Sequence, residues 1–394
     1  MAELEINLKF HEEEKGKYKE DMTEEETLYC FIKDISNVKR MQEKVRTLCS
    51  YSRVSAPFGK FSRDDLIKAK KILSDLLICV RDLEKLRRSS TEGLTDRLLA
   101  VYKHQAELTN DFYRHMPLGG FENTSLPMLN HNQFIKVFDK MVEQMLEFEI
   151  AGKIVTAAAQ KQETIDPFKY ISDAMETSIT LLNPDSLDAQ HILQYIQNSS
   201  TVKVSAIFSV TSKNSIELFK ESGVKLHNHR YLWHGTKPEN LLSILKLGLL
   251  ATPPHAISCG QAFGEGIYFA DAFQKSQGYC THSVDGYKYM LLCEVALGDV
   301  YTLEDVYRFD IFDLDEDLEK KVKQYNTLKI LGRNRPNPIY DKTLSTGVVM
   351  PLGSLIQSYS IYENKREIHA YSDYNEYTVK DQRSTVVRYL VRFQ

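Results

Sequence analysis

The stretch TVKVSAIFSV, residues 201–210, decides the fold class of this 394-residue chain. Its apolar residues Val202, Val204, Ala206, Phe208 and Val210 alternate with mostly polar neighbours, which is typical of a strand with one buried face. Upstream of it the apolar spacing is helical, and downstream most apolar segments alternate. The sequence therefore predicts an α+β protein, an N-terminal all-α helical bundle followed by a mostly antiparallel or mixed β domain.

Two long segments before this stretch have helical spacing. SRDDLIKAKKILSDLLICVRDLEKL, residues 62–86, begins with Ser62 and Asp65 at capping-box positions, and FIKVFDKMVEQMLEFEIA, residues 134–151, repeats the apolar period. MPLGGFENTSLPML, residues 116–129, separates them with Pro, Gly and Asn, which indicates a loop. These patterns favour a helical bundle.

After the stretch, short alternating segments predict further strands. One helix, KPENLLSILKLG, is interleaved: Pro238 lies in its first turn, Thr236 and Glu239 have capping-box spacing, and Gly248 can end it. The expected organisation is an acidic flexible lead-in at 1–24, a helical regulatory domain at 25–165, a linker at 166–185 and a catalytic domain at 186–394. The predicted strands are RYLWH (230–234), GIYFA (266–270), YMLLCEVALG (289–298), NEYTV (375–379) and VVRYLVRF (386–393).

The composition excludes several classes of protein. A net charge of −4 and a pI near 6.3 give no general basic field for nucleic acid, although a local patch is compatible with them. The six cysteines are scattered without a CxxC pair, which indicates reduced thiols in an intracellular protein and no metal site. The charged N-terminus does not resemble a signal or transit peptide, and we expect no membrane span.

Two motifs combine a strand with residues that suit a flat amide ligand. In YLWHGT, residues 231–236, His234 precedes Gly235, whose bare backbone can pair with a planar amide. In GIYFADAFQKSQGY, residues 266–279, Tyr268 and Tyr279 flank a turn that contains Ser276, and two rings can enclose a planar ligand. Each residue alone has a structural explanation: a satisfied histidine, a core tyrosine, a tyrosine on a helix face.

A third motif places a carboxylate in a strand. In DYNEYTV, residues 373–379, Glu376 lies on the face opposite Asn375 and Tyr377. A buried carboxylate costs several kcal/mol unless it is paired, whereas an exposed one is unremarkable. The motif alone leaves both alternatives open.

In combination the blocks resemble the catalytic domain of the poly(ADP-ribose) polymerases. The resemblance rests on RYLWHGT with Asn240, and on GEGIYFADAFQKSQGYC, LLCEVALGD and YNEYTV in this order, with LGRNRPNP and MPLGS as a fifth block. APFGKFSRDDLIKA and NDFYRHMPLGGF are similar to the family's regulatory helical domain. The resemblance covers about residues 25 to 394.

The resemblance implies that the chain consumes NAD⁺ and uses no metal. The family's His-Tyr-Glu triad falls on His234, Tyr268 and Glu376, and Lys275 matches a position beside the acceptor site. Glu376 would stabilise a ribosyl cation and polarise the acceptor hydroxyl, and its presence favours polymer formation. The NAD⁺-binding positions implied are His234, Gly235, Thr236, Asn240, Gly266, Tyr268, Ser276 and Tyr279.

Two positions depart from the family pattern, and alternatives stay open. Leu250 stands where an Arg is frequent and Gln261 where an aromatic residue is, so adenosine binding is in question. Transfer of a single ADP-ribose unit, or NAD⁺ binding without turnover, are the alternatives to polymer synthesis. The implied partners are NAD⁺ and acceptor proteins, itself included. DNA is a possible activator although no DNA-binding module is recognisable, no membrane is expected, and the nucleus is the implied location.

Overall fold

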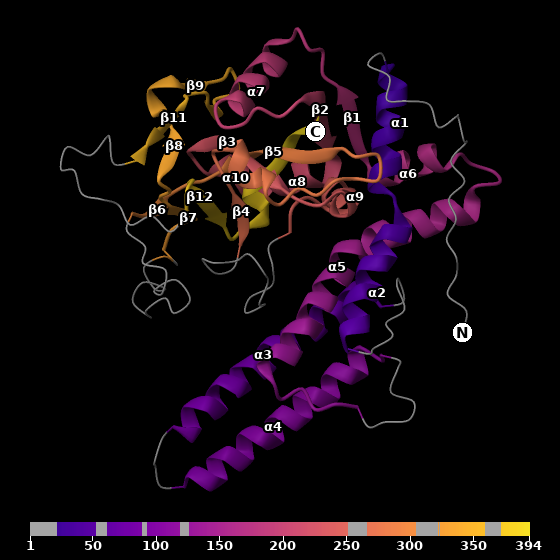
Figure 1. Cartoon of the computed structure of the whole chain (residues 1–394), viewed down its shortest axis with the longest axis vertical. Helices are drawn as coiled ribbons and strands as arrows, with labels where there is room; N and C mark the ends of the chain where they lie inside the picture. The colour runs from indigo at the N-terminus through magenta and orange to yellow at the C-terminus, as the bar shows by residue number, and fades with distance from the viewer. Residues whose placement is uncertain are drawn as a thin grey trace. The chain divides into compact units, whose positions relative to one another are not determined.

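The fold is described from a computed structural model of the chain. It describes residues 22–52, 61–88, 93–118, 126–250, 266–304, 322, 324–358 and 372–394, with the backbone alone for 45, 46 and 48–52. Contacts divide these residues into two units (Figure 1). One unit spans Asn37–Gln160. Among the described residues, the other joins those before Asn37 to those from Lys161 onward.

The first unit is helical. Its last two helices pack against each other through aromatic side chains, because the rings of Phe112 and Phe138 meet edge to face with centroids 5.5 Å apart. Ser62 caps the third helix of the chain by accepting a hydrogen bond from the Asp65 N–H at 3.1 Å, which confirms the predicted start. The helices are α2 (Val38–Ser52), α3 (Arg63–Arg87), α4 (Leu94–His115) and α5 (Asn132–Lys161).

The second unit is built on three sheets. The largest has the order β1-β2-β13-β5-β3-β10-β9 and is antiparallel except where β10 pairs with β3. The other sheets are β4-β12-β7-β6, in which β6 and β7 are parallel, and β11-β8. The strands are β1 (Thr177–Leu181), β2 (Val204–Ser212), β3 (His229–Gly235), β4 (Ile267–Phe269), β5 (Lys288–Ala296), β6 (Val300–Leu303), β7 (Thr327–Ile330), β8 (Asn334–Pro336), β9 (Asp341–Thr343), β10 (Val349–Pro351), β11 (Leu355–Gln357), β12 (Glu376–Val379) and β13 (Thr385–Phe393).

Short helices pack around these sheets. Their core includes Trp233, whose ring packs against Tyr195 and Phe273. With the mixed sheets after the helical part, the predicted α+β fold is confirmed. The helices are α1 (Glu24–Ile35), α6 (Pro167–Met175), α7 (Leu187–Gln197), α8 (Lys213–Glu221), α9 (Pro238–Leu247) and α10 (Phe273–Gln277), with 3₁₀ turns η1 (Gly223–Lys225), η2 (Pro338–Tyr340) and η4 (Gln382–Ser384).

Helix α1 packs on the large sheet. The Phe31 ring stacks on Phe208 at 5.4 Å and meets Tyr289 at 5.3 Å, and the Tyr289 hydroxyl donates to Asp34 at 2.6 Å. Burial raises the pKa of the Asp34 carboxyl. The contacts therefore group α1 with the sheets, whereas the expected domain boundary at residue 25 groups it with the helical part.

The residues 166–185, expected as a linker, form two regular elements. Asp166 caps α6 and Pro167 occupies its first turn. Strand β1 pairs antiparallel with β2, with Thr177 opposite Ser212, and forms the edge of the large sheet. A five-residue strand of Thr, Ser, Ile and Leu has too few apolar residues to stand out in the sequence.

The start of α9 differs from the sequence prediction. Lys237, not Thr236, is the N-cap residue, and its side chain makes no capping hydrogen bond. Pro238 takes the first helical position and fixes the start one residue later, so the Thr236–Glu239 capping box is wrong. Gly248 ends the helix with φ +85°, as predicted.

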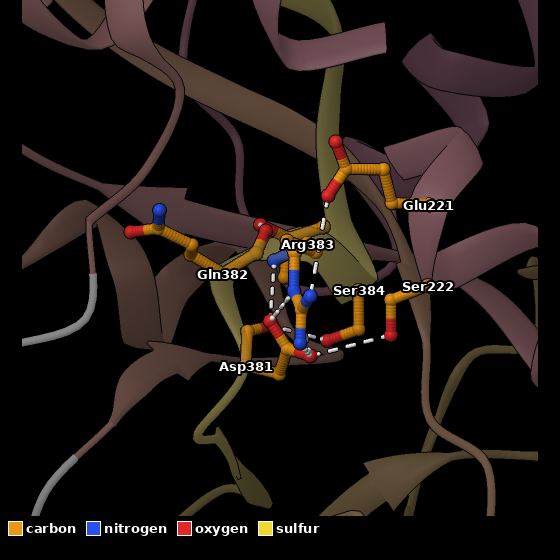
Figure 2. A network of polar contacts seen from close by, with 7 residues as sticks. Glu221, Ser222, Asp381, Gln382, Arg383 and Ser384 are labelled. Carbon is orange, nitrogen blue, oxygen red and sulfur yellow. Dashed lines mark hydrogen bonds and ion pairs between the residues drawn. The ribbon is translucent and has the colours of Figure 1, made fainter. Parts of the chain in front are cut away.

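A polar cluster fixes the turn between β12 and β13 (Figure 2). The Asp381 carboxylate accepts from the Arg383 backbone N–H at 2.9 Å and from the Ser222 hydroxyl at 3.2 Å. The Arg383 guanidinium pairs with the same carboxylate at 2.9 Å, and its other end lies 4.0 Å from Glu221. The turn that follows the Glu376 strand is thereby attached to the end of α8.

Candidate active site

Strand pairing brings the three predicted catalytic residues into one region. At the end of β3, the backbones of Trp233 and Ala270 exchange hydrogen bonds of 2.8 and 3.0 Å, which joins β3 to β4. Strand β4 in turn pairs with β12, with Tyr268 opposite Thr378. His234, Tyr268 and Glu376 therefore come from three neighbouring strands.

The His234 ring has a defined tautomer. Its Nδ1 lies 2.8 Å from the Tyr268 carbonyl oxygen, which can only accept, so Nδ1 carries the proton. Burial lowers the pKa of the imidazole, so it is neutral near pH 7. Its Nε2 then offers a lone pair, which suits the hydroxyl of a sugar.

Gly235 is the last residue of β3, and α10 lies against it. A Cβ atom at this position would be 1.9 Å from the Ser276 carbonyl oxygen and 3.2 Å from the Tyr279 Cβ. No side chain fits there, so Gly235 is required by close approach of the α10 backbone. The Ser276 hydroxyl donates to the Trp233 carbonyl at 3.0 Å, which fixes its position beside Gly235.

Glu376 is a buried, paired carboxylate. Only 6% of the residue is exposed, and its Oε1 lies 2.8 Å from the Lys275 ammonium of α10. The same ammonium donates to the Ser372 hydroxyl at 3.1 Å. The sequence left open whether this carboxylate is buried and paired or exposed, and in the structure it is buried and paired. Ser372 is part of this arrangement, and the sequence analysis missed it because Ser has no distinctive pattern there.

A second buried carboxylate holds both neighbours of Glu376. Asp271 follows β4 and accepts from the Asn375 amide at 2.7 Å and from the Tyr377 hydroxyl at 2.9 Å. Asn375 also accepts from the Gly332 N–H at 2.9 Å. Burial raises the pKa of the Asp271 carboxyl. The sequence analysis missed this cluster, although the Asp directly after the GIYFA strand was a visible signal.

The two tyrosines lie in different surroundings. Tyr268 packs against the apolar cluster that contains Leu328 and Ile330, so its ring is partly buried. Tyr279 follows α10 beside Gly235 and is 50% exposed. Exposure of a large ring next to a bare glycine leaves a stacking surface for a ligand.

The remaining predicted NAD⁺ residues lie near the same strands. The Asn240 amide donates to the Thr236 hydroxyl at 3.2 Å, and both are buried. Gly266 has φ +146°, and a Cβ there would be 2.5 Å from the Thr378 methyl group. Leu250 is 41% exposed, and Gln261 lies outside the described residues.

The described residues contain neither a cluster of metal ligands nor a membrane-spanning helix. In those ranges no three His, Cys, Asp or Glu side chains are arranged to hold a metal ion. No described helix is both long and apolar enough to cross a membrane.

Comparison with protein families gives a direct result. The model described as poly(ADP-ribose) polymerase catalytic domain matches residues 186–394, more than half of the chain. The chain belongs to the poly(ADP-ribose) polymerase family. The model of this family's regulatory domain matches residues 25–171. All the candidate site residues fall within the catalytic match, which is an ADP-ribosyltransferase domain.

Curated relatives carry the same family name. The chain is 32% identical to "Poly [ADP-ribose] polymerase tankyrase" of Caenorhabditis elegans over 94% of its own length and 16% of the relative. It is 29% identical to "Poly [ADP-ribose] polymerase 1" of Gallus gallus, over 86% of the chain and 31% of the relative. It is 28% identical to "Poly [ADP-ribose] polymerase 2" of Arabidopsis thaliana, over 92% of the chain and 53% of the relative. The chain thus spans about half or less of these poly(ADP-ribose) polymerases.

Proposed function

We propose that the chain is an NAD⁺-dependent poly(ADP-ribosyl)transferase. It cleaves the bond between nicotinamide and ribose and transfers ADP-ribose to acceptor proteins, itself included, and to the growing polymer. The observation that carries the proposal is the buried Glu376 carboxylate, which pairs with Lys275. Glu376 lies on β12, which pairs with the Tyr268 strand β4, and β4 is bridged to the His234 strand β3.

The nicotinamide end of NAD⁺ suits the end of β3. Its carboxamide is planar and needs one acceptor and one donor from a backbone, which Gly235 can supply without side-chain interference. The Ser276 hydroxyl adds a polar contact, and the half-exposed Tyr279 ring stacks on the pyridinium. Neutral His234 accepts a hydrogen bond from a ribose hydroxyl of the adenosine half through Nε2.

The transfer step uses the acid on β12. As the ribose C1′–N bond breaks, nicotinamide leaves with the bonding electrons and positive charge develops on the ribose. The Glu376 carboxylate stabilises this charge and accepts the proton of the acceptor hydroxyl, whose oxygen forms the new bond to C1′. Lys275 keeps that carboxylate in place beside the acceptor.

Polymer synthesis is favoured over transfer of a single unit by the same residue. Chain growth needs a group that activates the ribose hydroxyl of the preceding unit, and Glu376 is available for that role. Binding of NAD⁺ without turnover is a weaker alternative, because it gives no use for a buried, paired carboxylate beside the ribose.

Incubation with labelled NAD⁺ tests the proposal. The wild-type chain should release nicotinamide and become a smear on a gel, whereas a single sharp step would indicate transfer of one unit. Glu376→Gln should lower elongation by about 10²–10³-fold, as is usual for one preorganised electrostatic group. Glu221→Gln, which alters an exposed carboxylate of α8, is the matched control. Normal polymer length in Glu376→Gln would refute a role of this residue in elongation. If the wild type released no nicotinamide, NAD⁺-dependent transferase activity would be refuted.

The helical unit supplies a regulatory element in this proposal, with activation by nicked DNA as a further arm of the same assay. We expect removal of the helical unit to raise basal activity. The deletion has to spare α1, since Phe31 and Asp34 are bound to the large sheet. The informative variant therefore replaces residues 37–160 by a short Gly/Ser linker. Unchanged or lower activity in a folded variant would contradict regulation by this unit.

A further inference from the structure

The four-stranded sheet has a cavity on one side that the proposed reaction does not use. Its volume is about 230 Å³, and its lining includes Arg230 of β3, Lys329 of β7, Arg335 of β8 and Tyr377 of β12. Lys329 and Tyr377 are register partners, so they lie on the same face of the sheet. Glu376 precedes Tyr377 in the strand and lies on the opposite face, so the cavity is behind the catalytic carboxylate.

The charges in the cavity do not balance. Three cations, Arg230, Lys329 and Arg335, line it with two carboxylates, Asp271 and Asp341. Arg230 and Asp341 pair with each other at 2.9 Å. The Asp271 carboxylate accepts from Asn375 and Tyr377 through Oδ2, and its Oδ1 has no hydrogen-bond partner among the described residues. The lining therefore carries one more positive than negative charge.

Two of the cations have no acceptor among the described residues. Lys329 lies over the Tyr377 ring at 5.3 Å, and no described carboxylate is within 4.0 Å of its ammonium. The Arg335 side chain has no hydrogen-bond or ion-pair partner in those ranges, and its Nε is buried. Donors left without acceptors at a half-buried site cost free energy that an anion would recover.

We propose that this cavity binds a phosphate group. A phosphate group is negatively charged, as the surplus positive charge requires, and offers more oxygen acceptors to Lys329 and Arg335 than a carboxylate does. Arg335 presents a planar fork that fits phosphate oxygens, and Lys329 adds a point charge. Asn228 and Thr302 add further polar residues to the lining. The group comes from free phosphate or from a phosphorylated side chain of a partner protein.

Binding of inorganic phosphate to the full chain, measured by calorimetry at constant ionic strength, tests the site without NAD⁺ turnover. We expect saturable binding that Arg335→Gln weakens by about tenfold or more, because one charge-assisted contact is lost. Lys329→Met should weaken it similarly. Arg333→Gln is the matched control: Arg333 pairs with Asp373 outside the cavity, and its replacement should leave binding unchanged. Arg335 has no partner to lose, so its variant should keep the wild-type melting temperature.

A serine peptide and its phosphoserine form distinguish the two sources of phosphate. Tighter binding of the phosphoserine peptide than of inorganic phosphate identifies a phosphorylated partner, and the reverse identifies the free ion. Three results would each overturn the proposal. They are the absence of saturable phosphate binding, equal phosphate affinity of the wild type and Arg335→Gln, and equal affinity for the serine and phosphoserine peptides. Because no step depends on catalysis, its failure leaves the proposed transferase function untouched.

Discussion

Asp139 of the helical unit and Asp271 of the sheet unit are both buried, and they are held in different ways. In the helical unit, Asp139 of α5 pairs with Lys70 of α3 at 2.9 Å, and both side chains are 1% exposed. Neither of these groups has a regular hydrogen bond among the described residues. In the sheet unit, Asp271 has no ion pair within 4.0 Å in the described ranges and instead accepts two hydrogen bonds.

The difference indicates what each carboxylate does. A buried ion pair adds little net stability, because desolvation offsets attraction, but losing one partner leaves a costly unpaired charge. Lys70–Asp139 therefore fixes how α3 and α5 align. Asp271 instead attaches the turn after Tyr268 to both neighbours of Glu376. Damage to the first should appear in stability, and damage to the second in catalysis.

The largest effect is expected from breaking the helical pair. Lys70→Met should destabilise the helical unit by about 3–5 kcal/mol, because Asp139 then stays buried without a counter-charge. Hydrogen exchange of the α3 and α5 amides in the full chain measures the change. The double variant Lys70→Met/Asp139→Leu should recover most of the loss. Wild-type protection in the single variant would mean that the pair does not align these helices.

Asp271→Asn should act on turnover. Asn375 and Tyr377 both donate to one Asp271 oxygen, Oδ2, and an uncharged amide oxygen in its place accepts weaker hydrogen bonds, so Glu376 loses part of its support. We expect kcat to fall by about 10²-fold, a usual cost of misplacing a catalytic group, with little change in the KM for NAD⁺. Asp381→Asn, in the polar cluster at η4, is the control. A loss confined to KM or to melting temperature would argue against a positioning role.

The pH dependence of the helical unit gives a smaller effect. Burial raises the pKa of Asp139 from 3.8 to about 6, so the folded unit binds the proton more tightly than the unfolded chain. The stability contribution of this group is therefore greatest below the unfolded pKa and falls as pH rises through 6. Between pH 7 and pH 5 the helical unit should gain about 1 kcal/mol from this group. Hydrogen exchange at the two pH values should show the gain in stability in the wild type and its loss in Asp139→Asn. An equal change of stability with pH in both proteins would refute the attribution to Asp139.

Ser372→Ala should have the mildest effect. It removes one hydrogen bond to Lys275 and leaves the Lys275–Glu376 pair intact. A net hydrogen bond of about 0.5–1.5 kcal/mol corresponds to a two- to tenfold slower elongation. Ser372→Thr keeps the hydroxyl and should restore the rate. An unchanged rate in Ser372→Ala would mean that Glu376 alone holds the lysine.

Local patterns in the sequence identified much of the fold. The strands around Val204, Trp233, Tyr268 and Glu376 follow from alternation, and the Ser62 cap follows from its spacing to Asp65. Strand β1 was missed because its side chains are mostly short and polar. The start of α9 was misplaced because Pro238 outweighed the Thr236 cap.

The candidate site was only partly predictable. Glu376 and Lys275 followed from resemblance, but their pairing at 2.8 Å depends on how α10 meets β12. Asp271 and Asn375 are 104 positions apart, and no periodic pattern reports such a contact. The lining of the cavity behind β12 comes from separate segments between Asn228 and Tyr377, so its excess of cations is invisible in the linear order.

The position of α1 also bears on how the chain folds. Asp34 and Tyr289 are separated by 255 positions in the sequence, and the helical unit lies between them in the chain. A contact between residues so far apart in sequence is expected to form late in folding, because other contacts first have to offset the entropy cost of closing the loop. During synthesis the apolar side of α1 leaves the ribosome long before β2 and β5 exist to cover it. The nascent chain therefore carries Phe31 uncovered until the sheet is complete.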